Sequence, residues 1–347
     1  MSSSDALKYR AQYAVDGVRA TGGTQPVGHP DEDPRPVAAD ATHVDRAGGE
    51  PAEALRTELV AVVVAVVDGL PHVLTSAGEP RLPSGPLQSR HRSMQAGLRS
   101  WVEQQTGHPL GYVEQLYTFA DAGRAGHGGR VISVSYLGLT RVVDASSAWR
   151  SWYELFPWED QRADGPAVVD ELIAPMLAGW VSSSDPREQL VRRQRCDITF
   201  GRGSHPWLPD LVLQRYELLY EAGLVPESPR PAAVTVPGEP MVHDHRRILA
   251  TGIARLRTKS QYRPMVFELM PEEFTLGQLQ LVVEAIAGGR LHKQNFRRLV
   301  AQQELVEPTG HVTRETGGRP AQTFRFRREV LAERQVAGTS LPVVRSR

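Results

Sequence analysis

An uninterrupted run of apolar residues, Leu59–Val67, is the feature that most restricts how this chain can fold. It lies in the segment Glu58-Leu-Val-Ala-Val-Val-Val-Ala-Val-Val-Asp68, which is rich in valine and bounded by acidic residues. The run is too short to cross a bilayer, because a membrane-spanning helix needs about 20 apolar residues. Its length and its valine content instead predict a β-strand that is buried on both faces.

The segments that follow this strand alternate between strand-like and helix-like patterns. We expect further strands at His72–Thr75, Tyr112–Ala120 and Arg130–Thr140. Between the first two, Ser93–Thr106 has helical character, and Gly107 stands where a glycine commonly ends a helix. The order strand, strand, helix, strand, strand predicts a mixed α/β sandwich rather than a parallel βαβ array.

The N-terminal region differs in composition from the rest of the 347 residues. Residues 1–52 are rich in Ala, Asp, Gly, Pro and Thr, so we expect disorder there, with a short docking helix around Leu7–Val18 as the alternative. No apolar segment of the signal-peptide type begins the chain, and we expect a cytoplasmic protein without membrane contact. The single cysteine, Cys196, excludes an internal disulfide bond and a multi-cysteine zinc site.

The segment from about 145 to 240 follows no simple pattern. Helical stretches are expected around Ala167–Trp180 and Leu208–Ala222, and residues 226–240, with five prolines, predict a linker or an extended strand. Trp158-Glu-Asp and Arg215-Tyr-Glu-Leu-Leu-Tyr-Glu-Ala look structural, and their aromatic residues would cover a hydrophobic face, either as a contact between two copies or as a lid over the sensor pocket. The segment opens with an aromatic cluster. The cluster consists of Trp149, Trp152, Tyr153, Phe156, Pro157 and Trp158.

A clearer order of elements follows. His245–Lys259 predicts an amphipathic helix, because its aliphatic residues fall on one side. Thr275 can cap a helix that runs to Ala287, with Gln278 as the capping-box partner. His292–Gln303 predicts a second helix, and two short strands are expected at Val312-Thr and Thr323-Phe-Arg-Phe. Helix, short turn, helix and hairpin is the order of a winged helix-turn-helix.

The charge distribution supports a polyanion partner for this C-terminal part. The whole chain has no net charge, but residues 255–330 contain thirteen Lys or Arg against eight Glu and no Asp. A basic module on a mildly acidic body suits nucleic-acid binding, and a solvated basic surface is the alternative.

The helix near residue 100 resembles a Nudix box, in which a glycine leads into a helix ending Arg-Glu-aliphatic-any-Glu-Glu-any-Gly. The carboxylates of such a box hold Mg²⁺, which neutralises a diphosphate and activates water. Aligned on Gly107, the acidic positions fall on Trp101, Gln104 and Gln105, which bind a divalent cation poorly. The resemblance therefore implies a domain without catalysis, metal or cofactor; a generic amphipathic helix is the alternative. The degenerate box comprises Gly85, Arg99, Ser100, Trp101, Glu103, Gln104, Gln105 and Gly107.

Two further segments resemble one branch of the Nudix proteins, the Nudix-related transcriptional regulators of the NrtR family. Val113–Arg124 contains Gln-Leu-Tyr-Thr-Phe, and Arg130–Tyr136 ends in Ser-Val-Ser-Tyr; both look like core strands of that family. The loop between them departs from the Arg-Asp-Pro-Arg run that family members often carry, which puts ligand contacts there in doubt. The effector-binding candidates are Tyr117, Phe119, Arg124 and Arg130.

The resemblance to this family is strongest from His243 to Phe326. Phe267–Gln280 looks like the family's entry to the winged helix, and His292–Arg298 looks like its recognition helix. Phe296 and Leu299 would pack inward and leave the polar side chains free for base edges and phosphates. The residues expected to bind DNA are Thr275, Gln278, Lys293, Gln294, Asn295, Arg297, Arg298 and Arg319.

We therefore expect an α+β chain with a Nudix-like mixed α/β sandwich at 53–240, an insertion at about 145–240, a connecting helix at 241–262, a winged helix-turn-helix at 263–335 and a flexible tail at 336–347. The predicted function is a homodimeric transcriptional regulator, and the resemblance implies a repressor. It would bind a double-stranded DNA operator and sense ADP-ribose or another NAD-related nucleotide. The alternatives are a Nudix hydrolase with a metal site built from Glu103, Glu79 or Glu114, and an RNA-binding or protein-interaction module.

Overall fold

The computed structural model describes residues 56–76, 78, 80–120, 131–141, 149–163, 167–261, 264–314 and 320–329. Its strands are β1 (Arg56–Val67), β2 (Leu70–Leu74), β3 (Ser84–Pro86), β4 (Tyr112–Phe119), β5 (Val131–Leu139), β6 (Trp149–Ser151), β7 (Val306–Thr313) and β8 (Ala321–Phe326). Its α-helices are α2 (Met94–Thr106), α3 (Trp152–Leu155), α4 (Ala174–Ser182), α5 (Pro186–Thr199), α6 (Val212–Glu221), α7 (His245–Ser260), α8 (Leu276–Ala287) and α9 (Lys293–Gln302).

Strands β1 to β6 form one mixed sheet in the order β4-β5-β1-β2-β6, and β3 pairs with β1 beside β2. The β1–β5 pair is parallel, with Leu59 opposite Val134, and every other pair is antiparallel. The predicted mixed sandwich is therefore confirmed. The register of β4 on β5 shifts between Gln115 and Thr118, which marks a β-bulge in β4.

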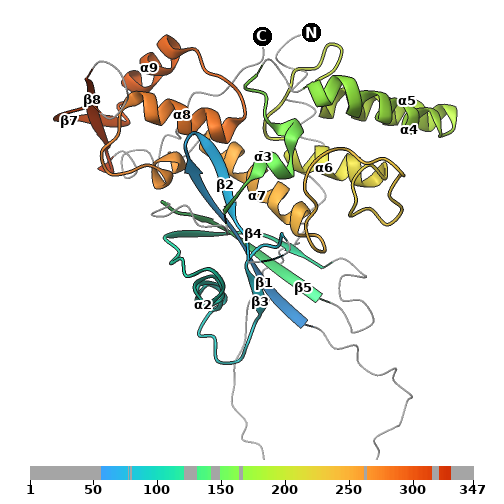
Figure 1. Ribbon diagram of the computed structural model, residues 1–347, viewed down its shortest axis with the longest axis horizontal. Helices are drawn as coiled ribbons and strands as arrows, with labels where there is room; N and C mark the ends of the chain where they lie inside the picture. Colours follow the sequence, from blue (N-terminus) through green and yellow to red (C-terminus); the bar gives the residue numbers. More distant parts are fainter. Residues whose placement is uncertain are drawn as a thin grey trace, which may run out of the picture. The chain divides into compact units, whose positions relative to one another are not determined.

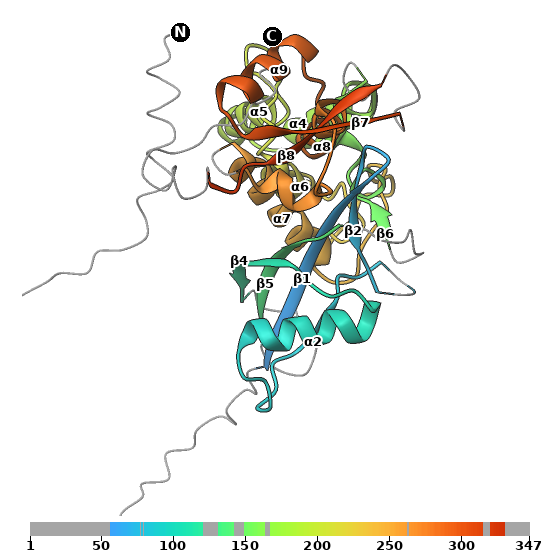
Figure 2. The same cartoon turned by 90° about the vertical axis from the view of Figure 1, so that its left-hand side faces the viewer.

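Strand β1 is buried on both faces, as its valine-rich sequence predicts. Leu59, Ala61 and Val63 pack with Leu98 and Val102 of α2 on one side. Val60, Val62 and Val64 belong to the larger core on the opposite side, together with residues of α7. Helix α2 and helix α7 therefore cover opposite faces of the sheet (Figure 1, Figure 2).

Helix α2 has the termini that its sequence predicts. Ser93 is the N-cap, and its Oγ accepts a hydrogen bond from Ala96 N at 3.1 Å. Gly107 ends the helix in the left-handed region, at φ 70°. On the other face of the sheet, α7 approaches β1 closely at Gly252, where an added Cβ would lie 2.8 Å from Val62 Cγ1. Glycine at this position permits the contact between α7 and the sheet.

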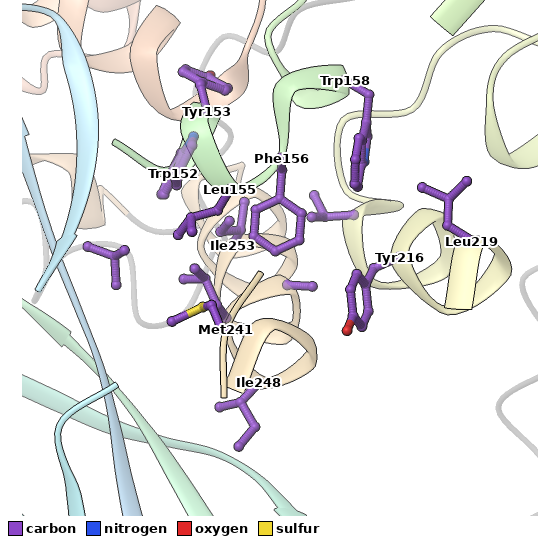
Figure 3. Close-up of a cluster of buried hydrophobic side chains, with 14 of the residues drawn as sticks. Trp152, Tyr153, Leu155, Phe156, Trp158, Tyr216, Leu219, Met241, Ile248 and Ile253 are labelled. Atoms are coloured by element: carbon purple, nitrogen blue, oxygen red, sulfur yellow. The ribbon is translucent and has the colours of Figure 1, made fainter. Parts of the chain in front are cut away.

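The aromatic residues of the middle segment are interior residues of the chain. Trp152, Phe156 and Trp158 are completely buried, and Tyr216 of α6 packs against Phe156 with ring centroids 6.1 Å apart. Figure 3 shows these rings with Ile248 and Ile253 of α7 beside them. The prediction that Trp158 and Tyr216 form a contact between copies or a lid is therefore wrong, because other parts of the same chain cover both rings.

The helices of the middle segment differ from the prediction. The stretch predicted at Ala167–Trp180 consists of a π-helical turn, η2 (Val169–Ile173), continued by α4, and a second helix, α5, was not predicted at all. Helix α6 begins at Val212, later than expected. The proline-rich segment at 226–240 is neither a strand nor a free linker, because Val236 is buried and its N–H donates to Leu224 O at 2.8 Å.

The C-terminal elements form a winged helix with a core of its own. Helices α8 and α9 are followed by the antiparallel hairpin β7–β8, and Phe274 adds one bridge to Phe324 of β8. Strand β7 starts at Val306, well before the short strand expected at Val312. The core contains Phe267, which stacks on Phe326 at 4.2 Å between ring centroids. Its buried members are Val266, Phe267, Met270, Phe274, Leu279, Phe296, Val300 and Leu305.

Candidate nucleic-acid interface

Helix α9 separates an apolar face from a polar face. Phe296 and Val300 are buried in the winged-helix core, so Val300 takes the inward position that was predicted for Leu299, which is only half-buried. The polar residues Lys293, Gln294, Asn295, Arg297 and Arg298 are all exposed. Among the residues that the structure describes, Lys293, Arg297 and Arg298 have no acidic partner. The outer surface of this helix therefore carries two exposed amides and three exposed cations that have no acidic partner in the described part of the chain.

The N-terminus of α9 adds backbone donors to this surface. Its N-cap residue, His292, makes no side-chain capping hydrogen bond. The first N–H groups of a helix have no partner within the helix, and together with the helix dipole they favour an anion at this end. Lys293 is the first residue of the helix and adds a positive charge there. The arrangement can bind a phosphate of a nucleic-acid backbone while the following side chains reach base edges.

Thr275 and Gln278 hold the start of α8 in place. Gln278 N donates to Thr275 Oγ1 at 3.2 Å, and Thr275 N donates to Gln278 Oε1 at 2.7 Å, which is the predicted capping box. Thr275 is buried, so its hydroxyl acts within the fold, and a direct role for either residue in DNA binding stays a prediction. Arg319, at the expected tip of the wing, lies outside the described residues.

Two arginines of the wing differ from the cations of α9 because they have acidic partners. Arg325 Nε donates to Glu307 Oε1 at 2.6 Å, and Arg327 Nη1 donates to Glu304 Oε2 at 3.3 Å. Both pairs are on the surface, where such bridges contribute little to stability. The charges of these two arginines are therefore matched locally, in contrast to those of Lys293, Arg297 and Arg298.

The degenerate box packs against β3. Gln105 Oε1 accepts from Ser84 N at 3.1 Å, and Gln105 Nε2 donates to Ser84 O at 2.6 Å. Trp101 covers Gly85, where an added Cβ would lie 2.4 Å from the indole ring, and Trp101 Nε1 donates to Pro86 O at 3.1 Å. Two positions that are acidic in a Nudix box are thus engaged here in holding α2 to the edge of the sheet.

The remaining residues of the box do not assemble a metal site. Glu103 and Gln104 are exposed, and Gln104 Nε2 donates to Ser100 Oγ at 3.4 Å. Arg99 donates to the carbonyl oxygens of Leu110 and Gly111. Within the described ranges, no group of three or more His, Cys, Asp or Glu residues could hold a metal ion. An indole and two amides do not fit the hard Mg²⁺ ion of a Nudix box, which requires carboxylate oxygens.

Strand β4 carries the described effector candidates. Tyr117 is 60% exposed, whereas Phe119 is buried, and their rings meet edge to face at 5.1 Å. At the bulge, Ser135 Oγ donates to Tyr117 O at 2.8 Å and thereby replaces a regular ladder bond. Bulges commonly redirect a side chain near functional sites. Arg124 and Arg130, the two cationic candidates, lie outside the described residues.

The same strand is tied to α7 by charged side chains that the sequence did not single out for this role. Glu114 accepts a hydrogen bond from Arg255 Nε at 3.2 Å, and it also bonds Lys259 and Tyr112. Burial opposes the ionisation of Glu114, but its bonds to Lys259 and Tyr112 hold the pKa of this carboxyl below its ordinary value. Strand β4 and helix α7 are therefore joined by a charged cluster as well as by the apolar core.

In the described part of the chain, no helix has the length and apolar composition needed to cross a bilayer.

Comparison with known proteins identifies the C-terminal part. Residues 266–326 match the family model of the NrtR DNA-binding winged helix domain, which confirms the winged helix expected from the sequence. The chain is 40% identical over 86 residues to the ADPR responsive transcriptional repressor NtrR of Acinetobacter baylyi. This match covers 25% of the chain and 34% of that repressor, so the chain spans about a third of the length of its curated relative.

Two solved structures are similar over a larger share of the chain. NrtR of Shewanella oneidensis, complexed with a 27mer DNA, is 18% identical, with a TM-score of 0.46, over 80% of this chain and 95% of that chain. A MutT/nudix family protein from Enterococcus faecalis is 15% identical, with a TM-score of 0.45, over 80% of this chain and 89% of that chain.

Proposed function

We propose that this chain, whose residues 266–326 are an NrtR-type DNA-binding winged helix, is a transcriptional regulator that binds duplex DNA through α9. The observation that carries the proposal is the division of α9 into two faces. Phe296 and Val300 anchor the helix in the core, while Lys293, Arg297 and Arg298 are exposed and lack acidic partners among the described residues. Basic side chains in this position bind phosphates and guanine edges.

The test of DNA binding measures affinity for the DNA upstream of the protein's own gene over a series of salt concentrations. If Arg297 or Arg298 binds a phosphate, its replacement by alanine should lower the salt slope of log K by about 1. Arg187→Ala and Arg193→Ala are matched controls, because both arginines are exposed on α5, and they should leave the affinity unchanged. The absence of any salt-sensitive, sequence-selective binding by the wild-type chain would contradict the proposal.

We also propose that the sheet domain is a Nudix-like sensor without hydrolase activity, which responds to ADP-ribose or a related nucleotide. Support comes from the box, whose acidic positions carry Trp101, Gln104 and Gln105, and from the exposed ring of Tyr117. The curated relative is an ADPR responsive repressor, which gives the first ligand to test. Repression, homodimer formation and binding to a palindromic operator belong to the same proposal.

The test of the sensor is a thermal-shift titration with ADP-ribose, with and without Mg²⁺. Ligand that binds only the folded state raises the melting temperature, and no metal should be needed. Tyr117→Ala should reduce the shift, while Leu190→Ala, which removes another highly exposed apolar side chain, should not. Mg²⁺-dependent turnover of ADP-ribose that is abolished in Glu103→Gln would establish the hydrolase instead.

A further inference from the structure

The C-terminal end of α8 is held by residues that lie outside the winged helix. Tyr153 Oη donates to Ala285 O at 2.7 Å, and Arg257 Nε donates to Ile286 O at 2.8 Å. The backbone N–H of Gln161 donates to Gly288 O at 2.6 Å. The last carbonyl groups of a helix have no partner within the helix. Here the residues that satisfy them come from the middle segment and from α7.

The arginine in this contact is fixed by a buried carboxylate. Glu159 is completely buried, and its Oε2 accepts from Arg257 Nη1 at 2.5 Å. A second buried arginine, Arg215 of α6, donates to both oxygens of Glu159 at 2.5 and 3.0 Å. Glu159 therefore links three elements, because it belongs to the 3₁₀ turn Pro157–Glu159, Arg215 to α6 and Arg257 to α7.

The charges of this group complement the end of α8. Two guanidinium groups and one carboxylate carry a net positive charge in a site that is closed to water. The C-terminal end of a helix carries a partial negative charge, so α8 presents the matching sign to Arg257. Burial opposes the ionisation of Glu159, but Arg215 and Arg257 keep the pKa of its carboxyl below the ordinary value.

The shapes also fit closely at this point. Gly288 follows α8 with φ +74°, and an added Cβ there would lie 2.4 Å from Glu159 O and 2.8 Å from Arg257 Nη2. The backbone of Glu159 therefore lies against the end of α8, and its carboxylate holds the arginine that binds there. The backbone and the carboxylate of Glu159 both restrict the rotation of the winged helix relative to α7.

We propose that Glu159 is a positioning residue for DNA binding, which fixes Arg257 and thereby sets the orientation of α8 and α9 relative to the sheet. The inference rests on the proposed function where it concerns DNA. It gives the middle segment the task of holding the DNA-binding domain. A purely structural role would change the stability of the fold without changing the orientation of α9 in the folded protein.

The chain supplies a matched control for a stabilising role. Arg246 of α7 and Glu227 form a second buried pair at 3.3 Å, and Arg246 also donates to Leu155 O. Within the described part of the chain, the hydrogen bonds and ring contacts of Arg246 reach neither α8 nor α9. Glu159→Gln and Glu227→Gln each leave a buried arginine without its full counter-charge, so both should lower stability. Only Glu159→Gln should release α8.

The experiment measures the distance between spin labels on the full chain, at Gln104→Cys on α2 and Gln302→Cys on α9, with Cys196→Ser to remove the native thiol. Both labelled positions are exposed. The wild type and Glu227→Gln should give the same narrow distance distribution, and Glu159→Gln should give a broader or shifted one. In the folded fraction, Glu159→Gln should also weaken binding to the operator by about tenfold, a typical coupling between sites. Glu227→Gln should bind DNA as the wild type does.

Equal distributions for all three proteins, or equal effects of Glu159→Gln and Glu227→Gln, would overturn the proposal. If Glu159→Gln does not fold, Arg257→Lys replaces it, because lysine retains a charge for Glu159 but cannot make every bond of the guanidinium. It should broaden the same distribution, and an unchanged distribution would overturn the proposal equally. A wild type that fails to bind DNA contradicts the proposed function alone, since the distance measurement does not depend on DNA.

Discussion

The side chain of Gln105 is hydrogen-bonded to the backbone of Ser84 in both directions, with its amide oxygen accepting from N at 3.1 Å and its amide nitrogen donating to O at 2.6 Å. A carboxylate could accept the first bond but could not donate the second. In the predicted alignment with a Nudix box this position is acidic, and the two bonds to Ser84 favour an amide there. The amide of Gln105 thus attaches α2 to β3 through two bonds that a carboxylate could not both make.

Gln105→Glu should therefore destabilise the protein rather than restore a metal site. The carboxylate would face Ser84 O without a donor, and we expect a decrease of about 1 kcal/mol in the free energy of unfolding. Gln104→Glu is the control, because Gln104 is exposed and makes one long contact with Ser100, and its effect should stay within about 0.5 kcal/mol. Urea unfolding of both variants measures the difference, and equal stabilities would show that the Ser84 contact is unimportant.

The buried carboxyl of Glu159 predicts a dependence of stability on pH. Burial opposes its ionisation, yet the two arginines hold its pKa below the ordinary value of 4.5. The unfolded chain has the ordinary pKa, so the carboxylate stabilises the fold above about pH 4.5, and this contribution is lost as pH falls through the lower folded pKa. At neutral pH the free energy of unfolding of the wild type should exceed that of Glu159→Gln by about 3–5 kcal/mol.

The difference in the free energy of unfolding between the wild type and Glu159→Gln should stay constant above about pH 5 and shrink as the pH falls below about 4. Urea titrations of both proteins across this range provide the measurement. A difference that grows as the solution becomes more acidic would contradict the direction assigned to the pKa of Glu159.

The single cysteine should be unreactive in the folded protein. Burial, assisted by Asp197, raises the pKa of the Cys196 thiol to about 11. At about pH 8, roughly one thiol in a thousand is then ionised, against about a quarter in an unfolded chain with an ordinary thiol pKa. Reaction with an aromatic disulfide reagent should accelerate at least about a hundredfold on unfolding. A Gln194→Cys variant, exposed on the same helix, should react fast without denaturant.

Two glycines with similar backbone angles should respond differently to alanine. Gly288 (φ +74°) lies against Glu159 O, whereas Gly310 (φ +83°) in β7 has nothing within 4 Å of an added Cβ. Gly310→Ala should lower the free energy of unfolding by about 1 kcal/mol, from backbone strain alone. Gly288→Ala should lower it by about 1–3 kcal/mol more, because the new methyl group collides with the backbone of Glu159. Thermal unfolding compares them, and equal costs would place Gly288 away from Glu159 in solution.

The elements that the sequence predicts well are those with local signals at their ends. Ser93 and Gly107 bound α2, and Thr275, Gln278 and Gly288 bound α8, in the way their residue types favour. The valine run of β1 and the apolar face of α7 were also predicted, because burial on both faces or on one side leaves a clear period in the sequence. The exposure of the polar residues of α9 was predicted in the same way, because apolar residues on one side of a helix leave the polar residues on the other side.

Most features that the sequence does not predict depend on contacts between residues that are distant in sequence, and helix α5 is the exception. Helix α5 begins with Asp185 as N-cap, Pro186 in the first turn and Glu188 three residues after the cap, a start pattern that is visible in the sequence. By contrast, Glu159 and Arg215 are 56 residues apart, and no local pattern links them. The burial of Trp152 and Trp158 also depends on α6 and α7, so their sequence context could not distinguish a core from an interface.

The parallel pairing of β1 with β5 has a consequence for a chain that is still being synthesised. Every β1 residue from Arg56 to Val64 has a partner in Val131–Leu139, so this edge of β1 stays open until those residues leave the ribosome. During that interval the valine-rich strand presents unpaired backbone groups and two apolar faces, the combination that promotes intermolecular β-pairing. A fragment that ends before β5 should accumulate as insoluble aggregate, whereas the complete sheet covers the strand.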